Sequence, residues 1–196
     1  MKKNIFLIAL AFTFYTSYAQ DNEYDKNKNF TIVSYNVENL FDTFDDAVKK
    51  DDEFTPNGKK KWTEKRFNEK INHIAKVLCS INKNELPEII GLYEIENDYV
   101  LKALLKQDCL AKGNYKIVHE ESPDFRGIDV ALLFREDAFK YLSHKKIKLN
   151  GFVKSFVCKA RKLGKGEAYF LYVEPCPGEA QRRRRTFYKA VMKFQQ

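Results

Sequence analysis

The chain carries SYNVENLFD from Ser34 to Asp42 and IIGLYEIEN from Ile89 to Asn97. FTIVSYNV, which begins at Phe30, is rich in β-branched and aromatic residues, and this favours a strand that is buried on at least one face. EIIGLY predicts a second buried strand. Asn36 and Glu94 therefore lie at the C-terminal ends of two predicted strands, and when such strands are neighbours both side chains point into one crevice at the edge of the sheet.

A helix is predicted after each of these strands. Thr63 is the expected N-cap of an amphipathic helix, and Asn97 or Asp98 is that of a second one. The apolar faces hold Phe67, Ile71, Ile74, Leu78 and Ile81 in the first helix and Val100, Leu101, Leu104 and Leu105 in the second.

Two more strands are predicted at Tyr115–His119 and Ile128–Arg135, close enough in sequence to pair as antiparallel neighbours. The whole order predicts an α/β fold, with one mixed β-sheet and helices on one face.

The segment from Asp42 to Lys61 separates the first strand from the first helix. Its Asp, Lys, Asn, Pro and Gly residues predict a long, exposed and polar surface loop. Such a loop beside a strand end often carries function.

The length of 196 residues, with 44% hydrophobic and 14% aromatic residues, is enough for one globular domain with a core. We predict four parts: a signal peptide at residues 1–19, a flexible lead-in at 20–29, the domain at 30–144 and a basic tail at 145–196. The tail holds fourteen Lys and Arg against three Glu, a net charge of +11, whereas the whole chain carries +8. Residues 1–144 therefore carry −3.

The N-terminus has the pattern of a cleaved secretory signal. Lys2 and Lys3 precede an apolar run from Ile5 to Tyr15, and Ser17-Tyr18-Ala19 forms a small-residue cleavage site. The alternative is an uncleaved anchor, but the run is shorter than the ~20 residues that span a bilayer. We expect a mature chain that begins near Gln20, has no later membrane span, and is secreted or periplasmic.

Four cysteines, Cys79, Cys109, Cys158 and Cys176, allow three complete pairings, and the sequence selects none of them. Export permits a disulfide. Cys79 lies near the apolar face of the first predicted helix, where the bare pattern favours a small buried hydrophobic residue.

Hard divalent cations such as Mg²⁺ prefer carboxylate and amide oxygens, so Asn36 and Glu94 are candidate ligands. Glu38 and Glu96 follow two residues later, where an extended backbone returns them to the same side. Glu96 and Asn97 are also candidates for capping the second helix.

Together with HEESPDFRGIDVALLF from His119 to Phe134, these segments resemble the endonuclease/exonuclease/phosphatase superfamily, whose fold is that of deoxyribonuclease I. The resemblance covers roughly Phe30 to Tyr141, includes DDEFTPNG from Asp51 to Gly58, and looks closest to a secreted bacterial branch. It implies a Mg²⁺-dependent phosphodiester hydrolase, with Mn²⁺ as the alternative metal.

By that resemblance, Glu94 is the principal metal ligand, Asn36 orients the metal water or a phosphate oxygen, and Glu38 supports the metal shell. Arg126 suits contact with a phosphate through its guanidinium, and Asp129 suits holding Arg126 or a tyrosine in place. His119 is a further catalytic candidate. An ordinary turn with an Arg–Asp pair is the alternative for the third segment.

The family usually continues with a histidine-bearing strand, a glycine-aspartate-phenylalanine-asparagine segment and a final aspartate-histidine pair. Here the corresponding strand is YFLYVEPC, from Tyr169 to Cys176, and it has no histidine. The resemblance thus implies a C-terminally truncated chain that is inactive or a very weak catalyst. Because the family fold stacks two sheets, we also expect an exposed apolar sheet face that favours self-association.

Three functions fit the sequence. The first is a nuclease or phosphodiesterase with nucleic acid or another phosphodiester as substrate. The second is a non-catalytic fragment that binds nucleic acid or an anionic surface through Arg182–Arg185. The third is a phosphatase that acts on a lipid or a small phosphate ester, because fold alone does not fix function.

Overall fold

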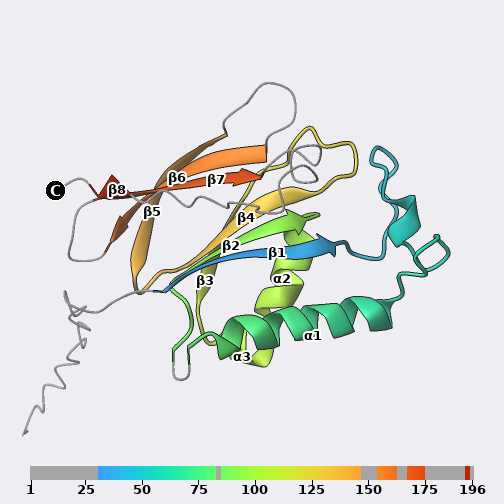
Figure 1. Ribbon diagram of the computed structural model, residues 1–196, viewed down its shortest axis with the longest axis horizontal. Coiled ribbons are helices and arrows are strands. Elements are labelled where there is room, and N and C mark those ends of the chain that lie inside the picture. Colours follow the sequence, from blue (N-terminus) through green and yellow to red (C-terminus); the bar gives the residue numbers. More distant parts are fainter. Residues whose placement is uncertain (1–30, 83–84, 147–153, 163–166, 175–192, 195–196) are drawn as a thin grey trace, which may run out of the picture.

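The computed structural model describes residues 31–82, 85–146, 154–162, 167–174 and 193–194. Two four-stranded sheets lie one above the other, and the helices lie beneath the first sheet (Figure 1). The predicted signal peptide, lead-in and Arg182–Arg185 lie outside the described residues. No helix in the described ranges is long and apolar enough to cross a membrane.

The first sheet is mixed, as predicted, and has the strand order β1-β2-β4-β3. Its strands are β1 (Ile32–Leu40), β2 (Ile89–Ile95), β3 (Tyr115–His119) and β4 (Asp129–Arg135). β1 and β2 are parallel neighbours, while β4 pairs antiparallel with both β2 and β3. This order confirms the predicted pairings and brings the ends of β1, β2 and β3 and the start of β4 to one edge.

Three helices cover one face of this sheet: α1 (Glu64–Ser80), α2 (Asp98–Leu105) and α3 (Asp108–Ala111) (Figure 1). Thr63 caps α1 by accepting from the Arg66 amide, and Asn97 caps α2 by accepting from two amides, as predicted. The predicted apolar positions of α1 are buried except Ile81, which follows the last helical residue and is 41% exposed. The core of the molecule lies between these helices and the sheet.

The other face of the first sheet is also buried, and this corrects the expectation of an exposed apolar face. Val130, Leu132 and Phe134 alternate with the residues of β4 that face the helices, and each is 3% exposed or less. A second antiparallel sheet lies over this face, in the order β5-β6-β7-β8 (Figure 1).

The second sheet consists of β5 (Phe139–Lys146), β6 (Lys154–Lys162), β7 (Glu167–Glu174) and β8 (Lys193–Phe194). Strands therefore run through much of the segment predicted as a tail, where the sequence signals were weak.

Most residues of the connection from β1 to α1 are exposed, as predicted, but part of the segment packs against the domain. The connection contains a short 3-10 helix, η1 (Asp52–Phe54), and the Phe54 ring stacks on Phe41 with ring centroids 4.0 Å apart. The Trp62 indole N–H donates to the Phe41 carbonyl at 3.0 Å. These aromatic contacts pull the chain inward, so that Asp51 is only 1% exposed.

A disulfide joins Cys79 in α1 to Cys109 in α3, with a Cα–Cα distance of 6.3 Å. Cys79 is thus a covalent link between two helices, and the interpretation of a simple buried hydrophobic residue was wrong. Sequence alone did not select this pair because the two cysteines are 30 residues apart and meet only once the helices pack.

Candidate active site

Asn36 and Glu94 meet at the edge of the first sheet. The Asn36 side chain donates from Nδ2 to Glu94 Oε1 at 3.0 Å, and its Oδ1 accepts from the Glu38 amide at 2.7 Å. The contact follows from the parallel pairing of β1 and β2, in which Asn36 stands opposite Tyr93. The structure therefore brings together two of the predicted metal ligands.

Both strands leave extended geometry at this point. Glu94 has φ 63°, Glu38 has φ 55° and Asn39 has φ 62°, all in the left-handed region that disfavours residues with a side chain. The register also shifts, because Leu40 is the next paired residue after Asn36 and stands opposite Ile95. Such irregular geometry tends to concentrate at functional sites.

This irregularity corrects the expected alternation of side chains. Glu38 and Glu96 do not simply return to the side of Asn36 and Glu94, because the backbone between them is not extended. Glu38 is exposed, whereas Glu96 is 8% exposed and accepts from the Asp42 amide at 2.6 Å.

Lys70, on α1, places a positive charge against this bulge. Its ammonium donates to the carbonyls of Glu38 at 2.5 Å and Asn39 at 3.1 Å. Burial lowers the pKa of Lys70, while the carboxylates of Glu38 and Glu94 oppose that shift. One ammonium thus interacts with both carboxylates, a feature that sequence reasoning missed because α1 and β1 are far apart along the chain.

The third segment forms a turn between β3 and β4. Arg126 makes a forked contact with Asp124, with 3.0 Å from Nη2 to Oδ2 and 3.3 Å from Nε to Oδ1. Asp129 does not hold Arg126, since its Oδ1 accepts from the Ser122 amide at 2.8 Å. Asp124 thus takes the place beside Arg126 that was one of the two roles expected for Asp129, and the expected contact of Asp129 with a tyrosine stays a prediction.

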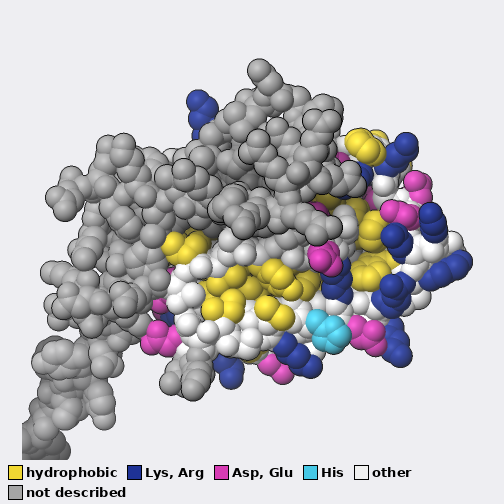
Figure 2. Space-filling model, in the orientation of Figure 1, with side chains coloured by type: hydrophobic (Ala, Val, Ile, Leu, Met, Phe, Trp, Pro, Cys, Tyr) yellow, Lys and Arg dark blue, Asp and Glu magenta, His cyan; other side chains and the backbone are white. Residues whose placement is uncertain are grey.

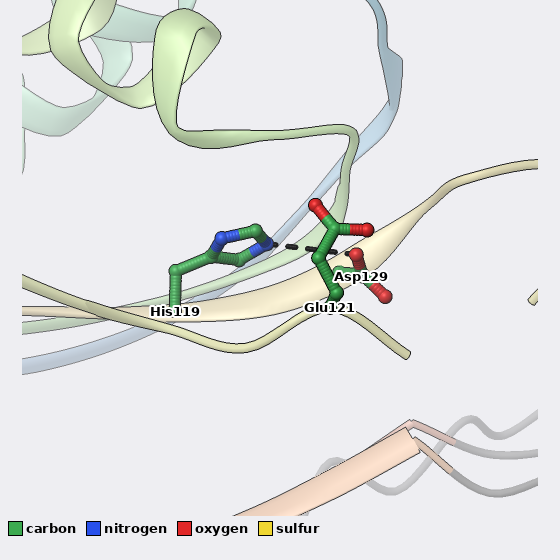
Figure 3. A group of neighbouring side chains, drawn as sticks. All are labelled: His119, Glu121 and Asp129. Carbon is green, nitrogen blue, oxygen red and sulfur yellow. Dashed lines mark ion pairs between the residues drawn. The ribbon is translucent and has the colours of Figure 1, made fainter. Parts of the chain in front are cut away.

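His119 lies between the carboxylates of Asp98 and Asp129 at the same edge, and Figure 3 shows the side that faces Asp129. Its Nδ1 is 3.2 Å from Asp98 Oδ1, and its Nε2 is 3.6 Å from Asp129 Oδ2. Burial favours the neutral ring, but Asp129 and Asp98 outweigh burial and raise the pKa of His119.

An acidic pocket that sequence reasoning missed lies beside these residues. It measures about 170 Å³ and is lined in part by Asp42, Glu96 and Glu121. Burial, with Asp42 and Asp51 nearby, raises the pKa of Glu96 to about 8. The fold assembles this pocket from three distant segments, so only the acidic character of each segment was visible in the sequence.

The β1–α1 connection and the β3–β4 turn are joined at this edge. The Lys50 amide donates to the Phe125 carbonyl at 2.8 Å, and Lys49 pairs with Glu121 at 3.3 Å. Gly127 has φ 79°, and a Cβ there would lie 3.2 Å from Lys49 Cγ, so this position favours glycine on both counts. These contacts fix the loops that flank the predicted site residues.

A sequence model described as Endonuclease/Exonuclease/phosphatase family matches residues 31–166. No curated protein matches the chain.

Solved structures of similar fold include humanized D. rerio TDP2, at 18% identity and TM-score 0.48, covering 78% of this chain and 53% of that chain. A D. rerio TDP2 complex with single-strand DNA product has 18% identity and TM-score 0.45, covering 78% of this chain and 49% of that chain. ANGEL2, described as a 2',3'-cyclic phosphatase, has 12% identity and TM-score 0.46, covering 74% of this chain and 40% of that chain. The chain thus spans about half the length of these structures.

Proposed function

Because the chain belongs to the endonuclease/exonuclease/phosphatase family, we propose that it is a phosphodiester hydrolase whose divalent cation binds beside Asn36 and Glu94. The observation that carries this proposal is the 3.0 Å contact between Asn36 Nδ2 and Glu94 Oε1 at the adjoining ends of β1 and β2.

The side chains at this edge fit a hard cation. Glu94 and Glu38 offer carboxylate oxygens, the ligand type that Mg²⁺ prefers, with Mn²⁺ as a substitute. Asn36 holds Glu94 in place through one end of its amide, while the other end fixes the Glu38 backbone. We assign Glu94 as the principal ligand and Glu38 as its support.

A bound Mg²⁺ would neutralise charge on the phosphoryl oxygens during attack by water. The amide of Asn36 suits a phosphate oxygen or a metal-bound water, because its Nδ2 is a donor beside Glu94. Arg126 suits contact with a second phosphate oxygen, since its pairing with Asp124 holds the guanidinium in a defined orientation. In this proposal Lys70 balances the two carboxylates when no cation is bound.

We propose a nucleic acid as the substrate. Residues 59–66 read KKKWTEKR, and Lys59, Lys60, Lys61, Lys65 and Arg66 are all exposed. Figure 2 shows Lys and Arg side chains gathered at the end of the molecule that holds the β1–α1 connection and the start of α1. Arg66 lies 5.3 Å from the centroid of the Trp62 ring. Such basic surfaces attract the phosphate backbone of nucleic acids.

Hydrolysis of a labelled single-stranded oligonucleotide and of bis(p-nitrophenyl) phosphate tests the proposal. Because Tyr169–Cys176 lacks the histidine that the family places on the corresponding strand, we expect weak Mg²⁺-dependent activity, which a chelator removes and which Glu94→Gln lowers further by roughly 10²-fold in kcat/KM. Glu69→Gln, at an exposed position of α1, is the matched control and should leave the rate unchanged. Activity on phosphomonoesters or lipids alone, or none with Mg²⁺ present, would contradict the proposal.

We also propose that the protein is exported. The apolar run from Ile5 to Tyr15 supports export, and so does the Cys79–Cys109 disulfide, because disulfides persist mainly in oxidising compartments. Expression of the full chain in a bacterium, followed by N-terminal sequencing of the exported fraction, should give a first residue near Gln20. Retention of Met1 on a chain found only in the cytoplasm would contradict export.

A further inference from the structure

We propose that His119, Glu121 and Asp129 form a second metal site, selective for a transition metal ion of the Zn²⁺ type and separate from the Asn36–Glu94 site. One ligand atom from each of the three residues lies within 4.8 Å of the others. The proposal rests on this geometry alone and does not require the proposed hydrolytic activity.

Two buried atoms of this cluster face each other without a hydrogen bond. In the described part of the chain, His119 Nε2 and Asp129 Oδ2 have no hydrogen-bond partner. Their side chains are only 6% and 1% exposed. A buried polar group without a hydrogen bond is costly, and these two atoms meet only as an ion pair at 3.6 Å, so a metal ion bound between them would satisfy both.

The spacing favours a metal ion over a shared proton. The distance from His119 Nε2 to Asp129 Oδ2 is 3.6 Å, longer than the roughly 2.7–3.2 Å of a hydrogen bond. Two ligand atoms each about 2.1 Å from a tetrahedral Zn²⁺ are separated by roughly 3.4 Å. The observed gap is therefore close to that of a tetrahedral site and needs little movement of either side chain.

The opposite side of the imidazole has the partner that metal-bound histidines usually have. His119 Nδ1 is 3.2 Å from Asp98 Oδ1. A metal ion that displaces the Nε2 proton leaves the proton on Nδ1 with this carboxylate, and the Nε2 lone pair then points toward Asp129 (Figure 3). A carboxylate, an imidazole and a metal in this order recur in zinc proteins.

Glu121 supplies the third ligand and a route of entry. It follows His119 by two residues, and its carboxylate lies beside the line from His119 to Asp129 (Figure 3). Glu121 also lines the acidic pocket of about 170 Å³, which attracts cations toward the site. Its side chain is 59% exposed and pairs with Lys49, so metal binding exchanges the ammonium for a metal ion of higher charge.

The mixture of nitrogen and oxygen ligands determines which metal ions the site would prefer. An imidazole nitrogen with carboxylate oxygens suits Zn²⁺ or a similar transition metal, whereas Mg²⁺ prefers oxygen ligands alone. Excess Mg²⁺ therefore fills the Asn36–Glu94 site and leaves this one selective for Zn²⁺.

The test is calorimetric titration of the full chain, freed of metal by a chelator, with Zn²⁺ in excess Mg²⁺. We expect one saturable site that is lost in His119→Gln and Asp129→Asn and weakened roughly 10- to 100-fold in Asp98→Asn, which removes the partner of His119. His73→Gln, at an exposed histidine of α1, should bind as the unmodified chain does. Glu94→Gln should also retain the site, and this separates the proposal from the proposed function.

Glu121 is exposed, so Glu121→Gln should not disturb folding. A loss of Zn²⁺ binding in this variant would therefore reflect the loss of a metal ligand. Circular dichroism without metal checks that the other variants fold. Nitrogen-15 shifts of His119 report which ring nitrogen changes on Zn²⁺ addition, and we expect a change at Nε2. The proposal is overturned by the absence of saturable Zn²⁺ binding, by equal binding in His119→Gln, or by an imidazole that stays protonated on both nitrogens when Zn²⁺ is present.

Discussion

Several residues at the sheet edge have a positive φ, a backbone conformation that residues other than glycine rarely adopt. Glu94, at φ 63°, is an extra residue in the pairing of β2 with β4, because Tyr93 pairs with Val130 and Ile95 pairs with the adjacent residue Asp129. Glu38, on β1, also has a positive φ. We interpret this strain as the cost of presenting two carboxylates to one cation.

Replacing Glu38 by glycine tests this cost. Glycine adopts positive φ freely, whereas other residues lose roughly 1–2 kcal/mol there. The flexibility of glycine in the unfolded chain offsets about half of that gain. We therefore expect Glu38→Gly to raise the free energy of unfolding by about 0.5–1 kcal/mol while weakening Mg²⁺ binding. A loss of stability on urea unfolding would argue against strain at this position.

Glu96 should make stability fall with rising pH. Burial raises its pKa to about 8 from an ordinary 4.5, so the folded chain holds a proton that the unfolded chain releases between these values. The free energy of unfolding therefore decreases from pH 4.5 to pH 8 and is level above pH 8, with each unit of pKa worth about 1.4 kcal/mol.

Glu96→Gln, which keeps an oxygen for the Asp42 amide, should flatten this slope and stabilise the protein at pH 8. Urea unfolding at a series of pH values measures the effect, with Glu69→Gln as the exposed control. An unchanged slope in Glu96→Gln would show that other groups cause the pH dependence.

At the scale of elements, the disulfide fastens α3 to α1. It closes a loop between residues 30 apart in sequence, for which chain entropy gives a stabilisation of about 3.6 kcal/mol. We expect reductant, or the double change Cys79→Ala and Cys109→Ala, to lower the free energy of unfolding by that amount. Replacing Cys158 and Cys176 by serine is the control, and a reductant effect that disappears in this control would assign the stabilisation to a different pair.

The basic segment at residues 59–66 is predicted to bind substrate backbone. Lys59→Glu with Lys65→Glu should weaken oligonucleotide binding and reduce the slope of log affinity against log salt by about one for each lost phosphate contact. Hydrolysis of bis(p-nitrophenyl) phosphate should be unaffected, because this small substrate does not extend over the segment. Lys76→Glu, exposed further along α1, is the control, and equal losses in it would indicate a general charge effect.

The elements themselves were largely predictable. Phe67, Ile71, Ile74 and Leu78 recur at helical spacing, and the pairing of β3 with β4 follows from their closeness in sequence.

The site was predictable only in part. The positions of Asn36 and Glu94 could be predicted because both lie at strand ends. The bulge at Glu38 could not, because it depends on backbone angles, and the burial of Asp51 depends on aromatic packing. The contact between His119 and Asp129 depends on the register of β3 with β4, which the sequence does not determine. The His-x-Glu spacing of His119 and Glu121 was a visible signal of a metal site.

At the scale of the whole molecule, the first sheet is enclosed between helices and a second sheet. Leu133 faces the helices and Leu132 faces the other way, and both are 1% exposed or less. Leu132→Ala and Leu133→Ala should therefore each cost about 2–5 kcal/mol in urea unfolding. A small cost for Leu132→Ala alone would mean that the second sheet does not cover this face in solution.

The proposed function requires that the adjoining ends of β1 and β2 hold a catalytic cation. Diffraction from a crystal of the full chain soaked in Mn²⁺, with data collected at the manganese absorption edge, would locate this cation. We expect an anomalous peak within coordination distance of the Glu94 carboxylate that disappears in Glu94→Gln. A manganese-loaded crystal with no peak at Glu94, or with an equal peak there in Glu94→Gln, would contradict the proposed function.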